Sequence, residues 1–215
     1  MDLLCVGSTG LVGRHVLNLA LKDPRVNKVT VLTRREIPQD DLKLNVQIVD
    51  FDHLPTQASW WKADAVICTL GTTIKVAGSK AAFRRVDLEY PLLVAKIARD
   101  HGTGTYVLNS AMGADSHSNF FYNQVKGELE DRLSSMNFKS LTLVRPGLIG
   151  GERVEFRLGE EMAKGVMKFL GPFLPKSLRI NEPAQIAKAL LEAAIAQDKG
   201  VKIISSKELL GSGTL

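Results

Sequence analysis

The chain has 215 residues, of which 45% are hydrophobic and 24% are charged, and its formal net charge is +5 at pH 7. No apolar run approaches the roughly 18 residues that a membrane-spanning helix needs. The basic residues are scattered, without the interleaved aromatic residues that are typical of nucleic-acid-binding surfaces. We therefore expect neither a membrane nor a nucleic acid as partner. Because no basic segment precedes a long apolar stretch at the N-terminus, we expect a cytoplasmic location.

The N-terminal segment predicts the start of a nucleotide-binding α/β sheet. Residues 3–6 are apolar and indicate a short buried strand, and residues 15–21 keep apolar side chains at helical intervals. Glycines recur at every third position between them, which permits a tight turn and a close approach of the backbone to a pyrophosphate at the helix N-terminus. Since the usual spacing is Gly-x-Gly-x-x-Gly, a purely structural turn is the alternative. The residues expected at the cofactor here are Gly7, Ser8, Thr9, Gly10, Leu11, Val12 and Gly13.

Strand and helix patterns alternate through the rest of the chain. Apolar and β-branched runs predict strands, and apolar residues at helical intervals predict helices. This alternation is typical of a Rossmann-like, doubly wound parallel sheet with helices on both faces, a three-layer α/β/α arrangement, and we expect a single domain over residues 1–215. The predicted strands cover residues 28–33, 45–49, 65–70, 105–109, 141–144 and 201–204, and the predicted helices residues 81–99, 123–136 and 185–197.

The segment from 147 to 183 has no regular pattern. It contains several glycines and prolines, and we expect it to form a small substrate-side region of the domain. Its apolar residues predict a cover over the substrate end of the sheet that becomes less mobile when ligand binds. These apolar residues are Met162, Met167, Phe169, Leu170 and Phe173.

Two arginines end the second predicted strand, where this fold selects its cofactor. An acidic side chain there accepts hydrogen bonds from the ribose of NAD, whereas an arginine accommodates the 2′-phosphate of NADP. Arg34 and Arg35 offer charged guanidinium groups that suit a phosphate. They therefore favour NADP(H), although two solvated surface arginines are the alternative, and Glu36 could hold a ribose if the turn is shifted.

Three residues form a candidate catalytic group. Tyr122 and Lys126 are four residues apart at the start of a predicted helix, so their side chains share one face, and Ser110 ends the preceding strand. A nearby ammonium lowers the pKa of a tyrosine, which can then exchange a proton with a carbonyl or alcohol oxygen near neutral pH. A serine hydroxyl can hold the same oxygen. The group is what hydride transfer between a nicotinamide and a ketone or alcohol requires.

Other reactive residue types predict structural roles. Cys5 and Cys68 lie inside apolar runs and are expected to be buried thiols rather than a disulfide or metal pair. Trp60 and Trp61 are expected to anchor a connection by packing. The four histidines have no metal-ligand spacing, so no metal site is expected.

With these motifs in place, the chain resembles the atypical branch of the short-chain dehydrogenase/reductase superfamily. The resemblance runs over nearly the whole chain, from the glycine turn to Arg145-Pro-Gly after the sixth predicted strand. Within that branch the chain is most similar to the oxidoreductase subfamily of the animal Tat-interacting protein. The matching strings are residues 70–73 (Leu-Gly-Thr-Thr), 83–87 (Phe-Arg-Arg-Val-Asp), 113–115 (Gly-Ala-Asp) and 122–128 (Tyr-Asn-Gln-Val-Lys-Gly-Glu).

This resemblance implies an NADPH-binding Rossmann domain with a Ser-Tyr-Lys active site. It implies that Gly71 and Thr72 border the cofactor and that Pro146 lies near the nicotinamide. The cofactor-binding set is completed by Asp50, Phe51 and Leu70. The chain departs from many members of the superfamily at Asp87, where an asparagine is common, so a proton relay through that asparagine is not carried over.

Two functions are compatible with these features. The first is an NADPH-dependent oxidoreductase that reduces a small carbonyl compound. The alternative is an NADPH-binding regulatory or sensor protein with little turnover, which binds protein partners. The intact Ser-Tyr-Lys group favours the enzyme, and the resemblance to a regulator favours the alternative. The substrate, the direction of the reaction and the oligomeric state stay open.

Overall fold

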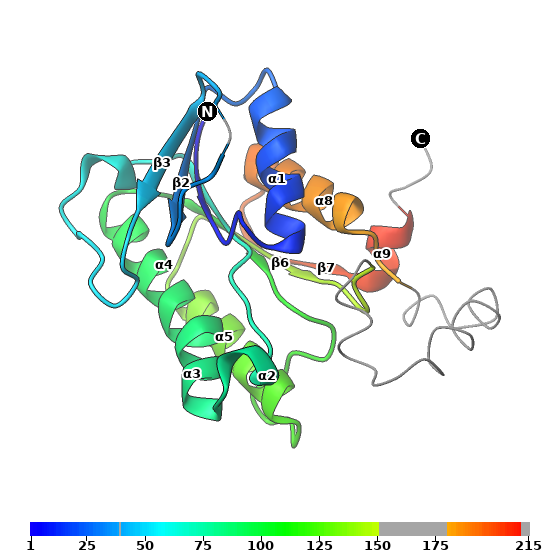
Figure 1. Cartoon of the computed structure of the whole chain (residues 1–215). Coiled ribbons are helices and arrows are strands. Elements are labelled where there is room, and N and C mark those ends of the chain that lie inside the picture. The colour runs from blue at the N-terminus through cyan, green and yellow to red at the C-terminus, as the bar shows by residue number, and fades with distance from the viewer. Residues whose placement is uncertain (39, 151–179, 212–215) are drawn as a thin grey trace.

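The computed structural model describes residues 1–38, 40–150 and 180–211, and these residues form a parallel seven-stranded sheet between two layers of helices (Figure 1). The strand order β3-β2-β1-β4-β5-β6-β7 is that of a doubly wound fold, in which the order reverses between β1 and β4. The strands are β1 (Asp2–Val6), β2 (Lys28–Thr33), β3 (Leu44–Ile48), β4 (Ala65–Cys68), β5 (Thr105–Asn109), β6 (Ser140–Arg145) and β7 (Gly200–Ser205).

Helices cover both faces of the sheet. On one face α1 (Leu11–Lys22) lies beside α8 (Pro183–Ala196), and on the other α4 (Tyr90–Asp100) lies beside α5 (Phe121–Ser135) (Figure 1). The shorter elements are η1 (Ser59–Trp61), α2 (Ile74–Ala77), α3 (Lys80–Arg84), η2 (Arg85–Glu89) and α9 (Ser206–Gly211). Among the described residues, none of these helices is long and apolar enough to span a membrane.

The apolar core has two layers because successive residues of a strand point to opposite faces of the sheet. In β1, Leu4 and Val6 belong to the layer under α4 and α5, whereas Leu3 and Cys5 belong to the layer under α1 and α8. Cys68 of β4 lies in the first layer, so the two cysteines are on opposite faces of the sheet. Both are buried free thiols, as predicted, and burial raises the pKa of Cys5 to about 12.

The predicted fold class is confirmed, and β2 and β5 match their predicted bounds. The largest difference lies in the helix expected over residues 81–99, which is divided into α3, the π-helical turn η2 and α4. The α2 turn was not predicted. α2 is a single helical turn capped by Thr73, whose side chain accepts a hydrogen bond from the Val76 N–H. Its four residues are too few to show a periodic hydrophobic pattern.

The two tryptophans pack as predicted. Trp61 is fully buried and its indole N–H donates to the Pro55 carbonyl over 2.8 Å. The Trp60 ring packs beside it, with 4.5 Å between the ring centroids. The pair closes the long connection between β3 and β4 against the core.

Candidate functional site

The glycine turn after β1 is closed by contacts that only glycine permits. Gly7 has a φ of +84°, and a Cβ on it would lie 2.6 Å from the Thr69 carbonyl carbon. A Cβ on Gly13, in the first turn of α1, would lie 2.2 Å from the Gly7 carbonyl oxygen. The Gly10 N–H donates to that same oxygen over 2.9 Å. The turn therefore presses the start of α1 against the end of β1.

The start of α1 has the features of an anion site. No side chain caps this helix at Gly10, and its first turn contains no acidic residue. The first N–H groups of the helix and its positive dipole end are thus available to a phosphate. The turn lies where the strand order reverses, because β1 pairs with both β2 and β4. The Thr69 N–H and hydroxyl both donate to the Val6 carbonyl, which joins the ends of β1 and β4.

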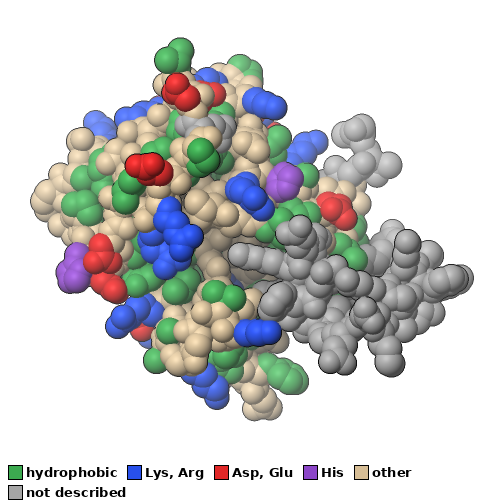
Figure 2. Space-filling view, in the orientation of Figure 1, with side chains coloured by type: hydrophobic (Ala, Val, Ile, Leu, Met, Phe, Trp, Pro, Cys, Tyr) green, Lys and Arg blue, Asp and Glu red, His purple; other side chains and the backbone are tan. Residues whose placement is uncertain are grey.

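The two predicted arginines lie beside the glycine turn. Thr9 from the turn and Thr33, Arg34 and Arg35 from the end of β2 line a hollow of about 160 Å³. The Thr33 hydroxyl bonds to the Arg35 backbone in both directions, donating to its carbonyl over 2.9 Å and accepting from its N–H over 3.2 Å. These bonds fix the turn that carries both guanidinium groups. Figure 2 shows Lys and Arg side chains around a hollow in the middle of the face that it presents.

Asp50 and Phe51 lie apart from the lining of this hollow. The exposed Asp50 carboxylate is 2.9 Å from His53 Nδ1, and this hydrogen bond is the main cause that lowers the pKa of Asp50 and raises the pKa of His53. Phe51 is buried and packs against Tyr90, with ring centroids 5.4 Å apart. In this structure, both side chains have structural partners in the connection after β3.

One face of α5 carries the candidate catalytic residues. Tyr122 and Lys126 are one helical turn apart, and Glu130 follows after one more turn. Lys126 is 3% exposed and its Nζ lies 2.8 Å from Oδ1 of Asp87, which is 1% exposed. Burial is the largest single influence and disfavours the charged lysine, but Asp87, with smaller effects of Tyr122 and Cys68, acts in the opposite direction, and together they raise the pKa of Lys126. Lys126 is therefore a charged ammonium within the fold.

Ser110 reaches the same face of α5 from the end of β5. It is buried, and its hydroxyl donates to the Glu130 carboxylate. Arg145, at the end of β6, pairs with Glu130 through Nε, which lies 3.1 Å from each carboxylate oxygen, and through Nη2. This pairing is the main cause that raises the pKa of Arg145.

Sequence reasoning missed Glu130. The signal was present, because Glu130 continues the four-residue spacing of Tyr122 and Lys126 and is flanked by apolar residues on the buried side of α5. A carboxylate at a core position is rarely without a partner. Its partners here come from two separate strands, so only the folded chain identifies them.

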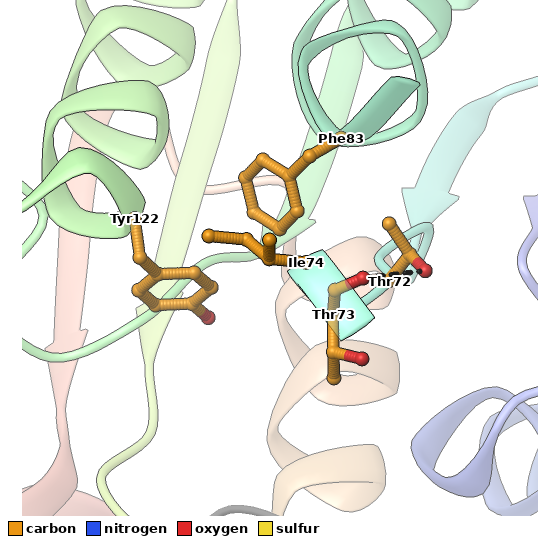
Figure 3. Close-up of a pocket in the computed structure, with 5 residues that line it drawn as sticks. All are labelled: Thr72, Thr73, Ile74, Phe83 and Tyr122. Carbon is orange, nitrogen blue, oxygen red and sulfur yellow. Dashed lines mark hydrogen bonds between the residues drawn. The ribbon is translucent and has the colours of Figure 1, made fainter. Parts of the chain in front are cut away.

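A second hollow lies beside Tyr122. Figure 3 shows the Tyr122 ring extending from α5 towards Ile74 and Phe83, with Thr72 and Thr73 beside them. These five residues line a hollow of about 250 Å³, and the ring centroids of Phe83 and Tyr122 are 5.9 Å apart. The Tyr122 side chain is thus at a partly apolar surface next to the end of β4, where a small organic molecule can approach it.

The remaining predicted residues lie at neighbouring strand ends. Leu70 packs against the core after β4, and the exposed Gly71 follows it. Pro146 follows β6, and its carbonyl accepts a hydrogen bond from the Met112 N–H over 2.8 Å, which joins the ends of β5 and β6. The predicted apolar cover over 147–183 lies largely outside the described residues, which include only its ends.

The described ends of this region meet at Asn181, which the sequence analysis missed. Asn181 is fully buried, its Oδ1 accepts from the Gly147 N–H over 2.8 Å, and its Nδ2 donates to the Ser206 carbonyl. A parallel bridge joins Asn181 to Ile149. One side chain thus connects the segment after β6 with the start of α9.

Comparison with known proteins agrees with this geometry. A family described as NAD(P)H-binding matches residues 7–152. The chain is 33% identical over 222 residues to "Protein fmp52, mitochondrial" of Emericella nidulans, covering 96% of this chain and 90% of the relative. It is 32% identical over 216 residues to "Protein HTATIP2" of Rattus norvegicus, covering 97% and 87%. The solved structure of MoeE5 in complex with UDP-glucuronic acid and NAD superimposes with a TM-score of 0.72 at 13% identity, covering 98% of this chain and 80% of that chain.

A parallel sheet of this order, with a glycine turn where the order reverses, defines a dinucleotide-binding Rossmann protein. The chain belongs to the NAD(P)H-binding family, in the atypical branch of the short-chain dehydrogenase/reductase superfamily. The predicted class is therefore confirmed. The predicted cytoplasmic location is wrong, because several fungal relatives are named as mitochondrial proteins.

Proposed function

We propose that this protein is an NADPH-dependent oxidoreductase that reduces a small carbonyl compound. The observation that carries this proposal is the common position of Tyr122 and Lys126 on one face of α5, beside the hollow at the end of β4. The family and the fold indicate that a dinucleotide binds. Tyr122 and Lys126 offer proton transfer at a place that a substrate can reach. Residues 1–215 act as a single domain in this proposal, with 147–183 on the substrate side.

The residues after β1 and β2 fit a phosphorylated dinucleotide. Because Gly7 and Gly13 have no Cβ, the start of α1 packs directly against the end of β1, and no side chain caps the helix there. In our proposal the pyrophosphate lies on residues 7–13, and Arg34 and Arg35 hold the 2′-phosphate. The other residues assigned to the cofactor are Asp50, Phe51, Leu70, Gly71, Thr72 and Pro146.

The side chains of α5 and β5 would handle the proton. When bound, the nicotinamide supplies a hydride to the carbonyl carbon. Tyr122 gives its phenolic proton to the carbonyl oxygen, and the nearby charged Lys126 favours the resulting phenolate and holds the ribose. Ser110 orients the oxygen by hydrogen bonding once its hydroxyl turns from Glu130. A positioned proton donor of this kind typically contributes about 10²–10⁴-fold to the rate.

A panel of neutral aldehydes and ketones tests the proposal through loss of NADPH absorbance. The expected result is protein-dependent oxidation of NADPH with at least one carbonyl compound, accompanied by an equal amount of alcohol. NADPH binding without turnover across the panel would contradict the enzyme and favour the sensor. Fluorescence titration with NADPH, run in parallel, shows that the protein in each assay is competent to bind nucleotide.

A further inference from the structure

A buried ion pair joins two segments at the edge of the candidate site. Asp87 Oδ1 lies 2.8 Å from Lys126 Nζ, and Asp87 Oδ2 accepts a hydrogen bond from the Thr72 N–H over 2.7 Å. A Cβ built on Gly71 would lie 3.4 Å from Asp87 Oδ1 and 3.9 Å from Lys126 Nζ. The ion pair is therefore directly behind the Gly71 backbone, and Asp87 connects α5 to the loop after β4.

The backbone that carries Asp87 is unusual. Asp87 lies in the middle of η2, a π-helical turn between α3 and α4. Such turns are rare and occur frequently at functional sites. The next residue, Leu88, is also buried, so the turn places a carboxylate and an apolar side chain inside the fold in succession. If α3 continued as an α-helix, these two side chains would follow the repeat of about 3.6 residues and would lie at different angles around the helix axis.

Holding these elements together does not require a buried charge. Arg84 of α3 already pairs with Glu128 of α5 over 2.7 Å, at a site where both side chains are partly exposed. Two charges taken fully out of water gain little stability over a well-packed apolar pair, because desolvation offsets their attraction. The Asp87–Lys126 pair therefore needs an explanation other than stability.

We infer that Asp87 is the positioning residue for Lys126: it holds the ammonium group behind Gly71 and makes it move together with the Gly71–Thr72 loop. This inference rests on the proposed function, in which that loop borders the cofactor and Lys126 acts on Tyr122. The titratable groups near Lys126 are Asp87 from η2, Tyr122 from α5 and Cys68 from β4. Of these three, Asp87 is the carboxylate, and its Oδ1 lies 2.8 Å from Nζ.

Asp87→Asn tests the inference, with Glu128→Gln as matched control. The first change removes the buried carboxylate charge and keeps a side chain that can accept from Thr72. The second removes a carboxylate charge from another ion pair between α5 and the segment 80–89. In Asp87→Asn we expect NADPH affinity within about threefold of the parent, because the glycine turn and arginines are intact. We expect kcat to fall about tenfold or more, since small misplacements in a reacting site are costly. Glu128→Gln should keep the parent kcat.

NMR of ¹³C-labelled lysine gives a readout that needs no substrate. The Lys126 signal, assigned by its loss in Lys126→Arg, should titrate at lower pH in Asp87→Asn than in the parent, by about one pH unit or more. Glu128→Gln should leave that titration unchanged. An unchanged Lys126 titration in Asp87→Asn, or a parent kcat in that variant, overturns the inference.

Asp87→Glu covers the case in which Asp87→Asn does not fold. It keeps the negative charge and displaces Nζ, so Lys126 should titrate as in the parent while kcat falls about tenfold. A parent kcat in Asp87→Glu overturns the positioning role. Absence of turnover in the parent would instead contradict the proposed function, and the lysine titration would still decide whether Asp87 controls Lys126.

Discussion

The Ser110 hydroxyl donates a hydrogen bond to the Glu130 carboxylate, two helical turns beyond Tyr122 on the same face of α5. Glu130 is held in turn by Arg145, so residues from β5, α5 and β6 meet at one buried group. While this bond persists, the Ser110 proton points at Glu130 and its oxygen can only accept from a ligand. Glu130 therefore decides how Ser110 is presented to the candidate site.

Replacing Glu130 with alanine should destabilise the fold and release Ser110. The change leaves the guanidinium of Arg145 and the Ser110 hydroxyl without their partner. Removing one member of a buried pair costs about 3–5 kcal/mol, and because Arg145 is partly exposed we expect about 2–3 kcal/mol here. Urea unfolding followed by circular dichroism measures the loss. Arg132→Ala, which breaks an exposed pair on the same helix, is the control and should cost less than about 1 kcal/mol. Equal losses in the two variants would contradict a structural role for the cluster.

Tyr122→Phe separates the enzyme from the sensor. The ring stays and only the phenolic hydroxyl is lost, so the hollow beside Phe83 keeps its shape. The variant should bind NADPH nearly as well as the parent, because nucleotide binding depends on the glycine turn and the arginines. Reduction of an active carbonyl compound should fall about a hundredfold or more. Stopped-flow measurement of NADPH oxidation checks this. Parent-rate reduction by the variant would remove Tyr122 from the mechanism.

The arginine pair predicts the choice of cofactor. NADPH should bind at least about tenfold tighter than NADH, a difference on the order of 1.4 kcal/mol. Changing both Arg34 and Arg35 to alanine should abolish most of that difference and leave NADH affinity nearly unchanged, since NADH lacks the 2′-phosphate. Fluorescence titration of both nucleotides gives the four dissociation constants. The idea is wrong if the unmodified protein binds the two nucleotides equally.

Gly127 predicts a sharp steric effect next to Lys126. A Cβ on Gly127 would lie 2.1 Å from the Ser116 backbone nitrogen and 2.2 Å from the Asp115 carbonyl carbon, and neither is a flexible side chain. Gly127→Ala should therefore destabilise the protein by about 1–3 kcal/mol despite the better helix propensity of alanine. Gln124→Ala, at an exposed position of α5, should stay within about 0.5 kcal/mol of the parent. Thermal unfolding compares the stability of the two variants. A Gly127→Ala protein as stable as the parent would show that the Asp115–Ser116 backbone does not pack against α5 at this point.

The Asp50–His53 pair predicts a pH-dependent contact after β3. The hydrogen bond lowers the pKa of Asp50 and raises that of His53, so the ion pair exists between those two values. The stability that the folded state gains from His53 in this pair is fully present below the ordinary histidine pKa of about 6.5. It is lost as pH rises through the raised pKa of His53. The contribution from Asp50 is lost as pH falls through the lowered value. NMR titration should place the His53 pKa above its usual value, and Asp50→Asn should return it; an unchanged His53 pKa in Asp50→Asn would exclude the contact in solution.

Local patterns determined most of the architecture. The alternation of strands and helices gave the fold class, and β2 and β5 agree residue for residue with their predicted bounds. The glycines after β1 were identified because a tight turn and a close backbone approach depend on neighbouring residues alone. Tyr122 and Lys126 were placed on one face because four residues are about one helical turn. Each of these inferences depends on short-range geometry that the sequence carries directly.

Tertiary structure decided which charges are buried and what they contact. Asp87 meets Lys126 only after η2 and α5 pack together, and the π-helical turn that carries Asp87 breaks the period from which helices are read. Glu130 contacts Ser110 and Arg145, which lie at the ends of β5 and β6. These two strands are neighbours in the sheet but distant in the chain. A buried charge is stable only with its partner in place, and that partner is determined by the long-range packing of the sheet and helices rather than by local spacing.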